Sequence, residues 1–380
     1  TLFVFPFNHY SETKEKTYRR IRDRLQELDE KSIIFLQYID QITCSIEGEN
    51  VDFLKKNISS ITQSCQKVTI SKRRSQSSWL VFSKASDTDR HRRVDVAFKL
   101  RRDDLTSKEK IDATIQSSPV IVFLPTELET NFRFLINGPY LTTPARDNIL
   151  NEGNEDLISL TASLVAEIPV MLRTDKVLLE LDLLNIDFYN ALPVRSSDLN
   201  EKYRFFQIPN AVKESFLNNS IIPSSKEGHY ISAKKARLAG SSDLRKLLSE
   251  SQLSMLVNEP ASWVSEEITE KSRQTSDFYR YLKDVLDIDE IDPEAFARKI
   301  SIIFLEKQDD IWMSRLYAFF DGQKALIKNN FLSKKAIIRL EDDRHVLPFS
   351  GDSPNAYLPV LEDNSLSFPT IKRTILKNSL

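Results

Sequence analysis

The chain has 380 residues, of which 41% are hydrophobic and 28% are charged, and its formal net charge is −2. A chain of this length exceeds the size at which one hydrophobic core keeps growing, so we expect two or three domains. Two cysteines exclude a disulfide framework and a four-cysteine zinc site, and the near-neutral total charge gives no global sign of nucleic-acid binding.

The expected location follows from the targeting signals. No apolar stretch approaches the ~20 residues that a membrane helix needs, and no signal-peptide pattern is present. We therefore expect a cytoplasmic protein that does not enter a membrane. Because the chain begins at Thr1 rather than Met, and its first residues already predict a strand, we interpret it as a fragment of a larger protein.

The first 150 residues mix strands and helices. Residues 12–28 have apolar side chains at helical spacing after a possible cap, Ser11. Residues 93–99 alternate apolar and charged side chains, which is typical of a half-buried strand. By the same criteria we predict a short helix at 31–38 and strands at 1–7, 41–46, 67–72, 78–83, 120–124 and 132–136.

The remaining residues are mainly helical. Leu157, Leu164 and Ile168 mark a buried helix face, and Pro169 should kink or end that helix because proline lacks the backbone N–H. Asp292 followed by Pro293 is a typical helix start. We predict further helices at 210–218, 242–257, 275–286, 293–306 and 309–329.

Two short segments of this helical part resemble each other at a constant spacing of 116 positions, as from Ile222 to Ile338. Each follows a helix ending in Phe-Leu and continues with two isoleucines, six residues and a histidine. Each predicts a β-hairpin with a polar turn. A repeated unit of helix and hairpin would fit a stacked, modular architecture.

Recognisable catalytic motifs are absent from the sequence. Nothing fits the GxxxxGK[ST] pattern of a P-loop, and the seven glycines do not cluster into a phosphate cradle. None of the four histidines has a Cys, Asp or Glu partner at the spacing of metal ligands, so we predict no metal site. The sequence therefore predicts no cofactor bound by this chain alone.

The most informative segment is PTELETNFRFLINGPYLTTPARDNI, from Pro125 to Ile149. It predicts a turn, a strand and a loop that places Arg146 at the start of a helix. This segment resembles the middle-domain loop of the Hsp90-like (GHKL) ATPases, including large proteins of the sacsin kind. In that family an arginine in such a loop reaches the terminal phosphate of ATP held by the preceding domain. The residue after the arginine is often glutamate there, and here it is Asp147.

The resemblance implies an α+β fold. Residues 1–155 would form a mixed α/β sandwich domain like a GHKL middle, or transducer, domain. Mainly helical segments with small β-hairpins would follow at 156–240 and 241–380. The resemblance gives a role to Arg146 alone, as a contact to the γ-phosphate.

On this hypothesis the chain is the middle region of an Hsp90-like ATPase, and it couples nucleotide state to conformational change or client binding. ATP and Mg would bind in the full-length protein, and the fragment alone would be inactive. The expected partners are its own N-terminal ATP-binding domain, a protein client and a second copy in a homodimer. The alternative for Arg146 is an ordinary ion pair with Asp147, Glu152 or Asp156.

A second hypothesis comes from residues 67–102, where eleven Lys and Arg face only three acids and surround Trp79 and Phe82. Clustered cations neutralise phosphates, and exposed aromatics stack on bases. A nucleic-acid-associated module, for instance in bacterial defence, would use Arg73, Arg74, Arg92 and Arg93. The alternative is a pair of hairpins with solvated, charged tips and core-facing aromatics. A third hypothesis is a non-catalytic interaction scaffold built on the repeated unit.

Overall fold

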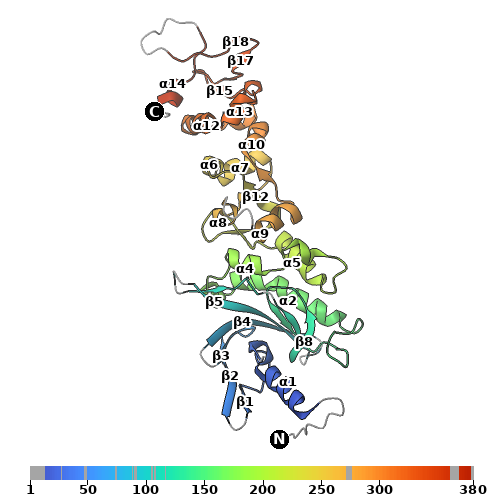
Figure 1. Cartoon of the computed structure of the whole chain (residues 1–380). Helices are drawn as coiled ribbons and strands as arrows, with labels where there is room; N and C mark the ends of the chain where they lie inside the picture. Colours follow the sequence, from blue (N-terminus) through green and yellow to red (C-terminus); the bar gives the residue numbers. More distant parts are fainter. Residues whose placement is uncertain are drawn as a thin grey trace. The chain divides into compact units, whose positions relative to one another are not determined.

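The chain folds into two compact units with a mixed α+β content, and we describe them from a computed structural model (Figure 1). Unit 1 comprises residues 1–215 and unit 2 comprises residues 216–380. The structure describes residues 13–26, 28–46, 49–72, 75–87, 89, 92–103, 106, 108–115, 117–270, 276–359 and 368–377. The predicted strand at 1–7, its following cap Ser11, and Arg73 and Arg74 lie outside these residues.

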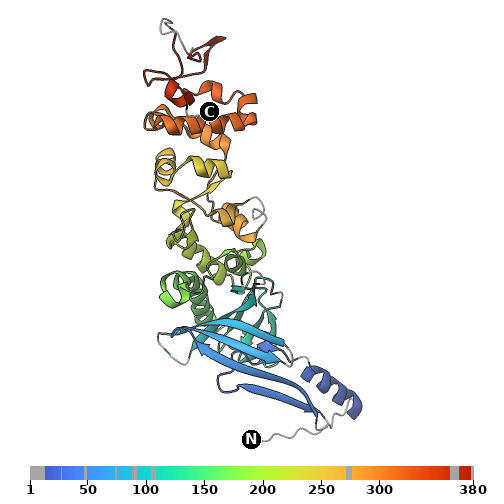
Figure 2. The same cartoon turned by 90° about the vertical axis from the view of Figure 1, so that its left-hand side faces the viewer.

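Unit 1 is built on a nine-stranded mixed sheet in the order β1-β2-β3-β4-β5-β9-β7-β8, with β6 paired to β5. The first five strands form an antiparallel meander, seen side by side in Figure 2, and only β7 and β9 are parallel. The strands are β1 (Gln41–Ile46), β2 (Glu49–Ser60), β3 (Cys65–Lys72), β4 (Ser75–Ala85), β5 (Arg93–Arg102), β6 (Glu109–Ile111), β7 (Pro119–Val122), β8 (Leu124–Glu129) and β9 (Leu135–Asn137).

Both faces of the sheet are covered because side chains of a strand alternate between its two faces. On one face, Ile33 and Ile34 pack with Trp79 and Val81 in a buried cluster. On the other face, the ring of Phe98 lies 5.6 Å from that of Phe188, between ring centroids. The covering helices of unit 1 are α1 (Lys14–Gln26), η1 (Glu30–Ser32), α2 (Glu155–Thr174), α3 (Lys176–Leu179), α4 (Ile186–Ala191), η2 (Ser196–Leu199) and α5 (Gln207–Asn218), which crosses into unit 2.

Helix α2 is the long core helix of unit 1. It packs on β4 and β5, so the boundary between the compact units lies at Ser215 rather than where the sequence turns helical near residue 156. Pro169 lies inside α2, and the helix continues to Thr174 instead of ending there. Among the described residues α2 alone is long and apolar enough to cross a membrane, and half of that stretch is buried inside the fold.

Two sequence predictions for unit 1 differ from the structure. Residues 31–38 do not form a helix beyond the 3₁₀ turn η1, and Ile33 and Ile34 are buried in the cluster against the sheet. Strand β2 was not predicted, because its polar residues Lys55, Lys56 and Asn57 conceal the alternation. Lys56 is buried, and its ammonium donates to the carbonyl of Leu36.

Unit 2 is a series of short helices between small sheets, and one of its buried clusters contains Trp263, Phe296 and Trp312. The predicted helix at 242–257 is divided because Ser249 forms a capping box with Gln252 and starts a new helix. The helices are α6 (Ser242–Leu247), α7 (Glu250–Val257), α8 (Glu266–Thr269), α9 (Asp277–Arg280), the π-helix η5 (Tyr281–Val285), α10 (Pro293–Lys299), α11 (Ile302–Glu306), α12 (Asp310–Gly322), α13 (Lys324–Lys328) and α14 (Arg373–Lys377), with 3₁₀ turns η3 (Ala233–Lys235) and η6 (Leu332–Lys334).

Both hairpins predicted in unit 2 are present. β10 (Ile222–Pro223) pairs with β11 (Tyr230–Ile231), and β15 (Ile338–Arg339) pairs with β16 (His345–Val346). The turn of the second hairpin is one residue shorter: Ile222 pairs with Ile231, whereas Ile338 pairs with Val346. The 116-residue spacing therefore relates the first strands of the two hairpins, but not the paired residues of their second strands. A further hairpin, β17 (Phe349–Ser350) with β18 (Ser353–Pro354), follows the second copy.

In the first copy, an additional segment extends the hairpin. The backbone N–H of Ser225 donates to the carbonyl of Trp263 at 2.8 Å, and that of Ser265 donates to Pro223 at 2.9 Å. The same segment, which includes β13 (Ser262–Trp263), runs parallel to β12 (Ala236–Ala239), and β12 also pairs with β14 (Glu290–Ile291).

The second copy repeats these hydrogen bonds at the matching positions. The N–H of Glu341 donates to Thr370 at 3.3 Å, and that of Lys372 donates to Arg339 at 3.1 Å. Tyr357 pairs in parallel with Thr370, as Arg237 of β12 does with Trp263 in the first copy. The internal similarity read from the sequence is therefore a repeated strand arrangement.

Candidate functional site

The candidate site is the loop from Leu141 to Leu150, which folds over the turn between β7 and β8. Two backbone hydrogen bonds close the loop. The N–H of Thr143 donates to the carbonyl of Asn148 at 3.0 Å, and the N–H of Leu150 donates to the carbonyl of Leu141 at 2.8 Å. The prediction that Arg146 lies at the start of a helix is wrong, because α2 begins only at Glu155. Arg146 has a φ of 58°, which is a left-handed turn conformation.

The guanidinium of Arg146 is held by main-chain carbonyls. Its Nη2 donates to the carbonyl oxygens of Val122 at 2.9 Å and Leu124 at 3.1 Å. In the opposite direction, the N–H of Glu127 donates to the Arg146 carbonyl at 3.3 Å. The long arginine side chain is therefore fixed against the β7–β8 turn, and Nε and Nη1 keep their N–H groups available because no acceptor among the described residues binds them.

No carboxylate of the described residues lies within ion-pair distance of Arg146. Asp147 instead accepts a hydrogen bond from the hydroxyl of Thr143, and Asp156 lies 3.7 Å from Arg92. Glu152 is exposed and forms no contact with the guanidinium. The ordinary ion pair with one of these three acids is therefore not formed, and the positive charge of Arg146 is uncompensated locally.

The turn beneath the arginine combines strain with exposed apolar surface. Phe123 lies between the two carbonyls that Arg146 binds, and its φ of 64° is unusual for a bulky residue. Phe123 is 57% exposed, its chain neighbour Leu124 is 48% exposed, and Leu141, at the start of the loop, is 50% exposed. The guanidinium of Arg146 is thus bound to a turn whose residues Phe123 and Leu124 expose apolar surface.

Two polar side chains fix the loop from behind. Asn154 is buried; its amide donates to the carbonyls of Leu141 and Leu150 at 3.0 Å each, and its oxygen accepts from the Leu141 N–H at 2.7 Å. Arg204 donates to the side chain of Asn148 at 2.8 Å. Neither residue was singled out from the sequence, because their partners are separated from them in the chain and the contacts depend on the folded loop.

Several described cations of the basic segment are paired with carboxylates of unit 1. The ammonium groups of Lys67 and Lys99 each lie 2.6 Å from a carboxylate oxygen, of Glu109 and Glu30 respectively. Arg93 donates to Asp95 at 2.8 Å, and Arg92 lies 3.7 Å from Asp156.

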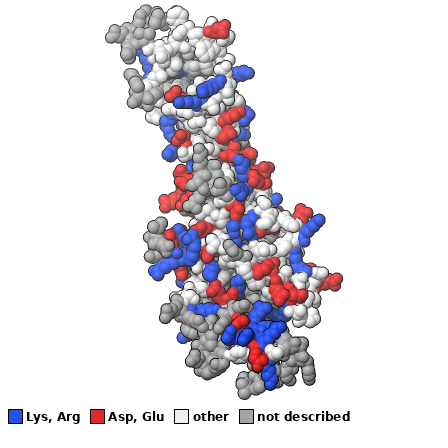
Figure 3. All heavy atoms as spheres, in the orientation of Figure 1, with Lys and Arg blue, Asp and Glu red and all other residues white. Residues whose placement is uncertain are grey.

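The aromatic residues of this segment face the core. Trp79 is 1% exposed and Phe82 is completely buried, so neither is available to stack on a base. One alternative predicted from the sequence placed these aromatic side chains in the core, and the structure shows that arrangement. The sequence analysis missed a different basic cluster: α1 carries Arg19, Arg20, Arg22 and Arg24, and Lys and Arg atoms gather over it in Figure 3.

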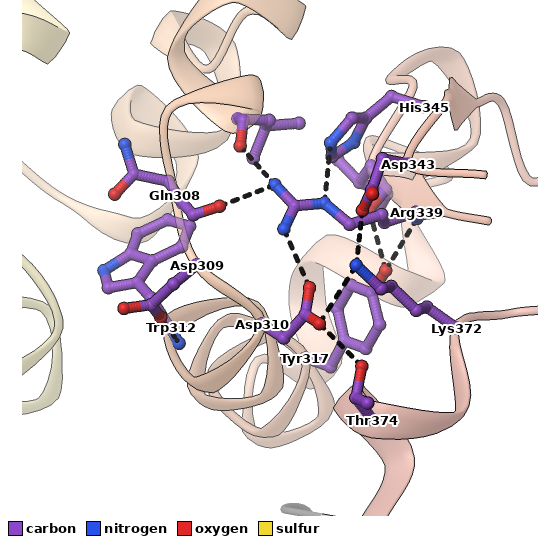
Figure 4. Close-up of polar contacts among 12 residues, drawn as sticks. Gln308, Asp309, Asp310, Trp312, Tyr317, Arg339, Asp343, His345, Lys372 and Thr374 are labelled. Atoms are coloured by element: carbon purple, nitrogen blue, oxygen red, sulfur yellow. Dashed lines mark hydrogen bonds and ion pairs between the residues drawn. The ribbon is translucent and has the colours of Figure 1, made fainter. Parts of the chain in front are cut away.

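A second polar cluster lies in unit 2, around Asp310 at the start of α12 (Figure 4). Its carboxylate accepts from Arg339 at 3.0 Å, from Thr374 at 2.6 Å and from Lys372 at 3.1 Å. Burial alone would raise the pKa of Asp310, but hydrogen bonds from these three side chains lower it overall. Arg339 also donates to the carbonyls of Leu305 at 2.6 Å and Gln308 at 2.8 Å.

This unit 2 cluster borders an open pocket of about 600 Å³, which includes Asp342 and Arg344 in its lining. Its cations already bind acceptors of the same cluster, and Arg344 donates to Asp342 at 2.6 Å. The arrangement therefore joins α12, the second hairpin and α14 rather than presenting unused charge. The Arg146 loop is the site at which charge, exposure and backbone strain coincide. Comparison with protein-family models, curated proteins and solved structures found no match for this chain.

Proposed function

We propose that unit 1 is the middle region of an Hsp90-like (GHKL) ATPase, and that Arg146 contacts the γ-phosphate of ATP bound by a preceding domain. The observation that carries the proposal is a guanidinium fixed by the carbonyls of Val122 and Leu124 that has no carboxylate partner among the described residues. A planar cation held in this way offers its remaining N–H groups to phosphate oxygens and stabilises charge in phosphoryl transfer.

The surroundings of Arg146 support a partner domain at this place. Phe123 and Leu124, in the turn that Arg146 binds, and Leu141, in the same loop as Arg146, are each about half exposed. Apolar groups around a fixed charge are suited to exclude water when another domain approaches, and a drier site strengthens the electrostatic interaction. The ATP and Mg would belong to that domain, and we place such an ATPase in the cytoplasm.

The test is ATP turnover by the full-length protein with Arg146→Ala. We expect a loss of at least ~10-fold, the scale for one charge-stabilising group in a transition state. Arg146→Lys should also be impaired, because one ammonium cannot bind two carbonyls and a phosphate with the geometry of a guanidinium. Arg92→Ala is the matched control, since Arg92 is a partly exposed arginine of the same unit.

Thermal unfolding and ATP affinity should be measured for all three variants. Equal turnover of Arg146→Ala and the wild type, with ATP still bound, would remove the proposed role. A loss of turnover that accompanies an equal loss of thermal stability would also count against it, because the arginine would then act through the loop's folding.

For unit 2 we propose a scaffold role that is compatible with the first proposal. The observation that favours it is the repeated set of backbone hydrogen bonds between strands. The N–H of Ser265 donates to the carbonyl of Pro223, and at the matching position the N–H of Lys372 donates to the carbonyl of Arg339. Units that repeat such contacts stack neighbours into extended binding surfaces. Client binding and homodimer formation by the full-length protein belong to this proposal.

A further inference from the structure

The two copies in unit 2 differ in what covers their apolar floor. In the first copy, the floor consists of Phe216, Ile221, Ile222 and Val264, all completely buried. The same positions in the second copy are Leu332, Ile337, Ile338 and Ile371: the first three by the 116-residue spacing, and Ile371 by its place in the ladder.

The first floor packs at Phe216 against the helical segment formed by α9 and η5. The ring of Phe216 lies 5.5 Å from Phe278 and 5.8 Å from Tyr281, between ring centroids. Phe278 and Leu282 are completely buried, and Tyr281 is 1% exposed. These three residues have the spacing i, i+3 and i+4, which places them on one face of a helix.

Among the described residues, the second floor faces a groove. Leu332, Ile337, Ile338 and Ile371 line a groove of about 400 Å³, within the range of pockets that hold ligands, about 300–1,000 Å³. On its rim, Ile327 is 49% exposed and Phe349 is 52% exposed. Among the described residues, the second copy has no counterpart of α9 and η5.

We propose that this groove binds an amphipathic helix with an aromatic residue at position i and an aromatic residue and a leucine at i+3 and i+4. The first copy supplies the argument, because Phe216 of the matching floor packs there against a helical segment with this pattern. Helix-in-groove binding of this kind relies on a few apolar anchors on one helix face. The proposal is independent of Arg146, since the groove and the arginine loop belong to different units.

The probe is a fluorescent peptide with the sequence of residues 276–288, SDFYRYLKDVLDI. A short peptide is only weakly helical in water, so a covalent staple should join the positions of Arg280 and Asp284, which are exposed in unit 2. The control peptide carries the same staple and alanine in place of Phe278 and Tyr281. Fluorescence anisotropy with the full chain measures both affinities.

We expect saturable binding of the probe, and an affinity at least about tenfold lower for the alanine peptide, as for the loss of anchor residues. The protein variant Ile327→Glu should weaken the probe by a similar factor. Ile303→Glu is its control, because Ile303 is 69% exposed and lies outside the groove lining. Both changes are at exposed positions, so both variants should fold.

Three results would overturn the proposal. One is the absence of saturable probe binding at protein concentrations up to about 1 mM. A Kd of about 1 mM corresponds to a binding free energy of only about 4 kcal/mol. Another is equal probe binding by Ile327→Glu and the wild type. The third is self-association of the chain that Ile327→Glu abolishes, measured by sedimentation, because the groove would then belong to a second copy.

Discussion

At the scale of single residues, the buried guanidinium of Arg339 is held by both backbone and side-chain acceptors. Arg339 is 4% exposed and binds two carbonyls as well as Asp310. Its Nε donates to Nε2 of His345 at 3.1 Å. That geometry requires a neutral imidazole, because a protonated ring nitrogen cannot accept a hydrogen bond.

His345 should therefore make stability depend on pH. Burial and then the positive charge of Arg339 lower the pKa of His345 below its ordinary value of 6.5. At pH values between the pKa of His345 in the folded chain and its higher pKa in the unfolded chain, the unfolded chain binds more protons. The contribution of His345 to the free energy of unfolding is therefore full above the unfolded pKa and is lost as the pH falls towards the folded pKa. His345→Gln keeps an acceptor and cannot titrate, so its denaturant midpoint should fall less on acidification. Parallel pH curves for the two proteins would contradict this linkage.

Asn154 is the residue on which the shape of the arginine loop depends most. Asn154→Ala removes three hydrogen bonds, so the Leu141 N–H and the Leu150 carbonyl each lose a partner in the loop. We expect a loss of about 1–3 kcal/mol in the free energy of unfolding, measured in urea. Asn57→Ala, at an exposed position of β2, should change it by less than about 0.5 kcal/mol. A loss at Asn154 no larger than at Asn57 would show that the loop closes without this clamp.

At the scale of elements, local patterns located most strands and helices, and capping residues decided where they divide. The alternation in residues 93–99 predicted β5, and Asp292 caps α10 as expected, accepting from Ala295 at 2.7 Å. Ser249 looked like an ordinary position inside a long amphipathic pattern, yet its hydroxyl starts α7. Strand β2 is set by pairing with both neighbours, which the local sequence does not encode.

The candidate site could be predicted only in part for the same reason. The proline-rich loop identified Arg146 as a residue of interest from the sequence. Its contacts depend on the turn at Val122 and Leu124, which is separated from it by a strand and brought close only by the sheet. The left-handed conformation of Arg146 also has no local signal, since Gly or Asn is the residue that usually marks it.

At the scale of the whole molecule, the division at Ser215 predicts that the two units lose their structure separately. Phe98→Ala removes a completely buried ring that contacts Phe134 and Phe188, which should cost unit 1 about 3–5 kcal/mol. Hydrogen exchange measured by mass spectrometry should then show lost protection in residues 1–215 and unchanged protection in residues 216–380.

The reciprocal variant is Phe296→Ala, which removes a completely buried ring from the main cluster of unit 2. It should reverse the pattern, with unit 2 exposed and unit 1 protected, because each unit has its own hydrophobic cluster. If either variant released both halves together, the chain would unfold as one cooperative body. The division at Ser215 would then not separate two independently stable units.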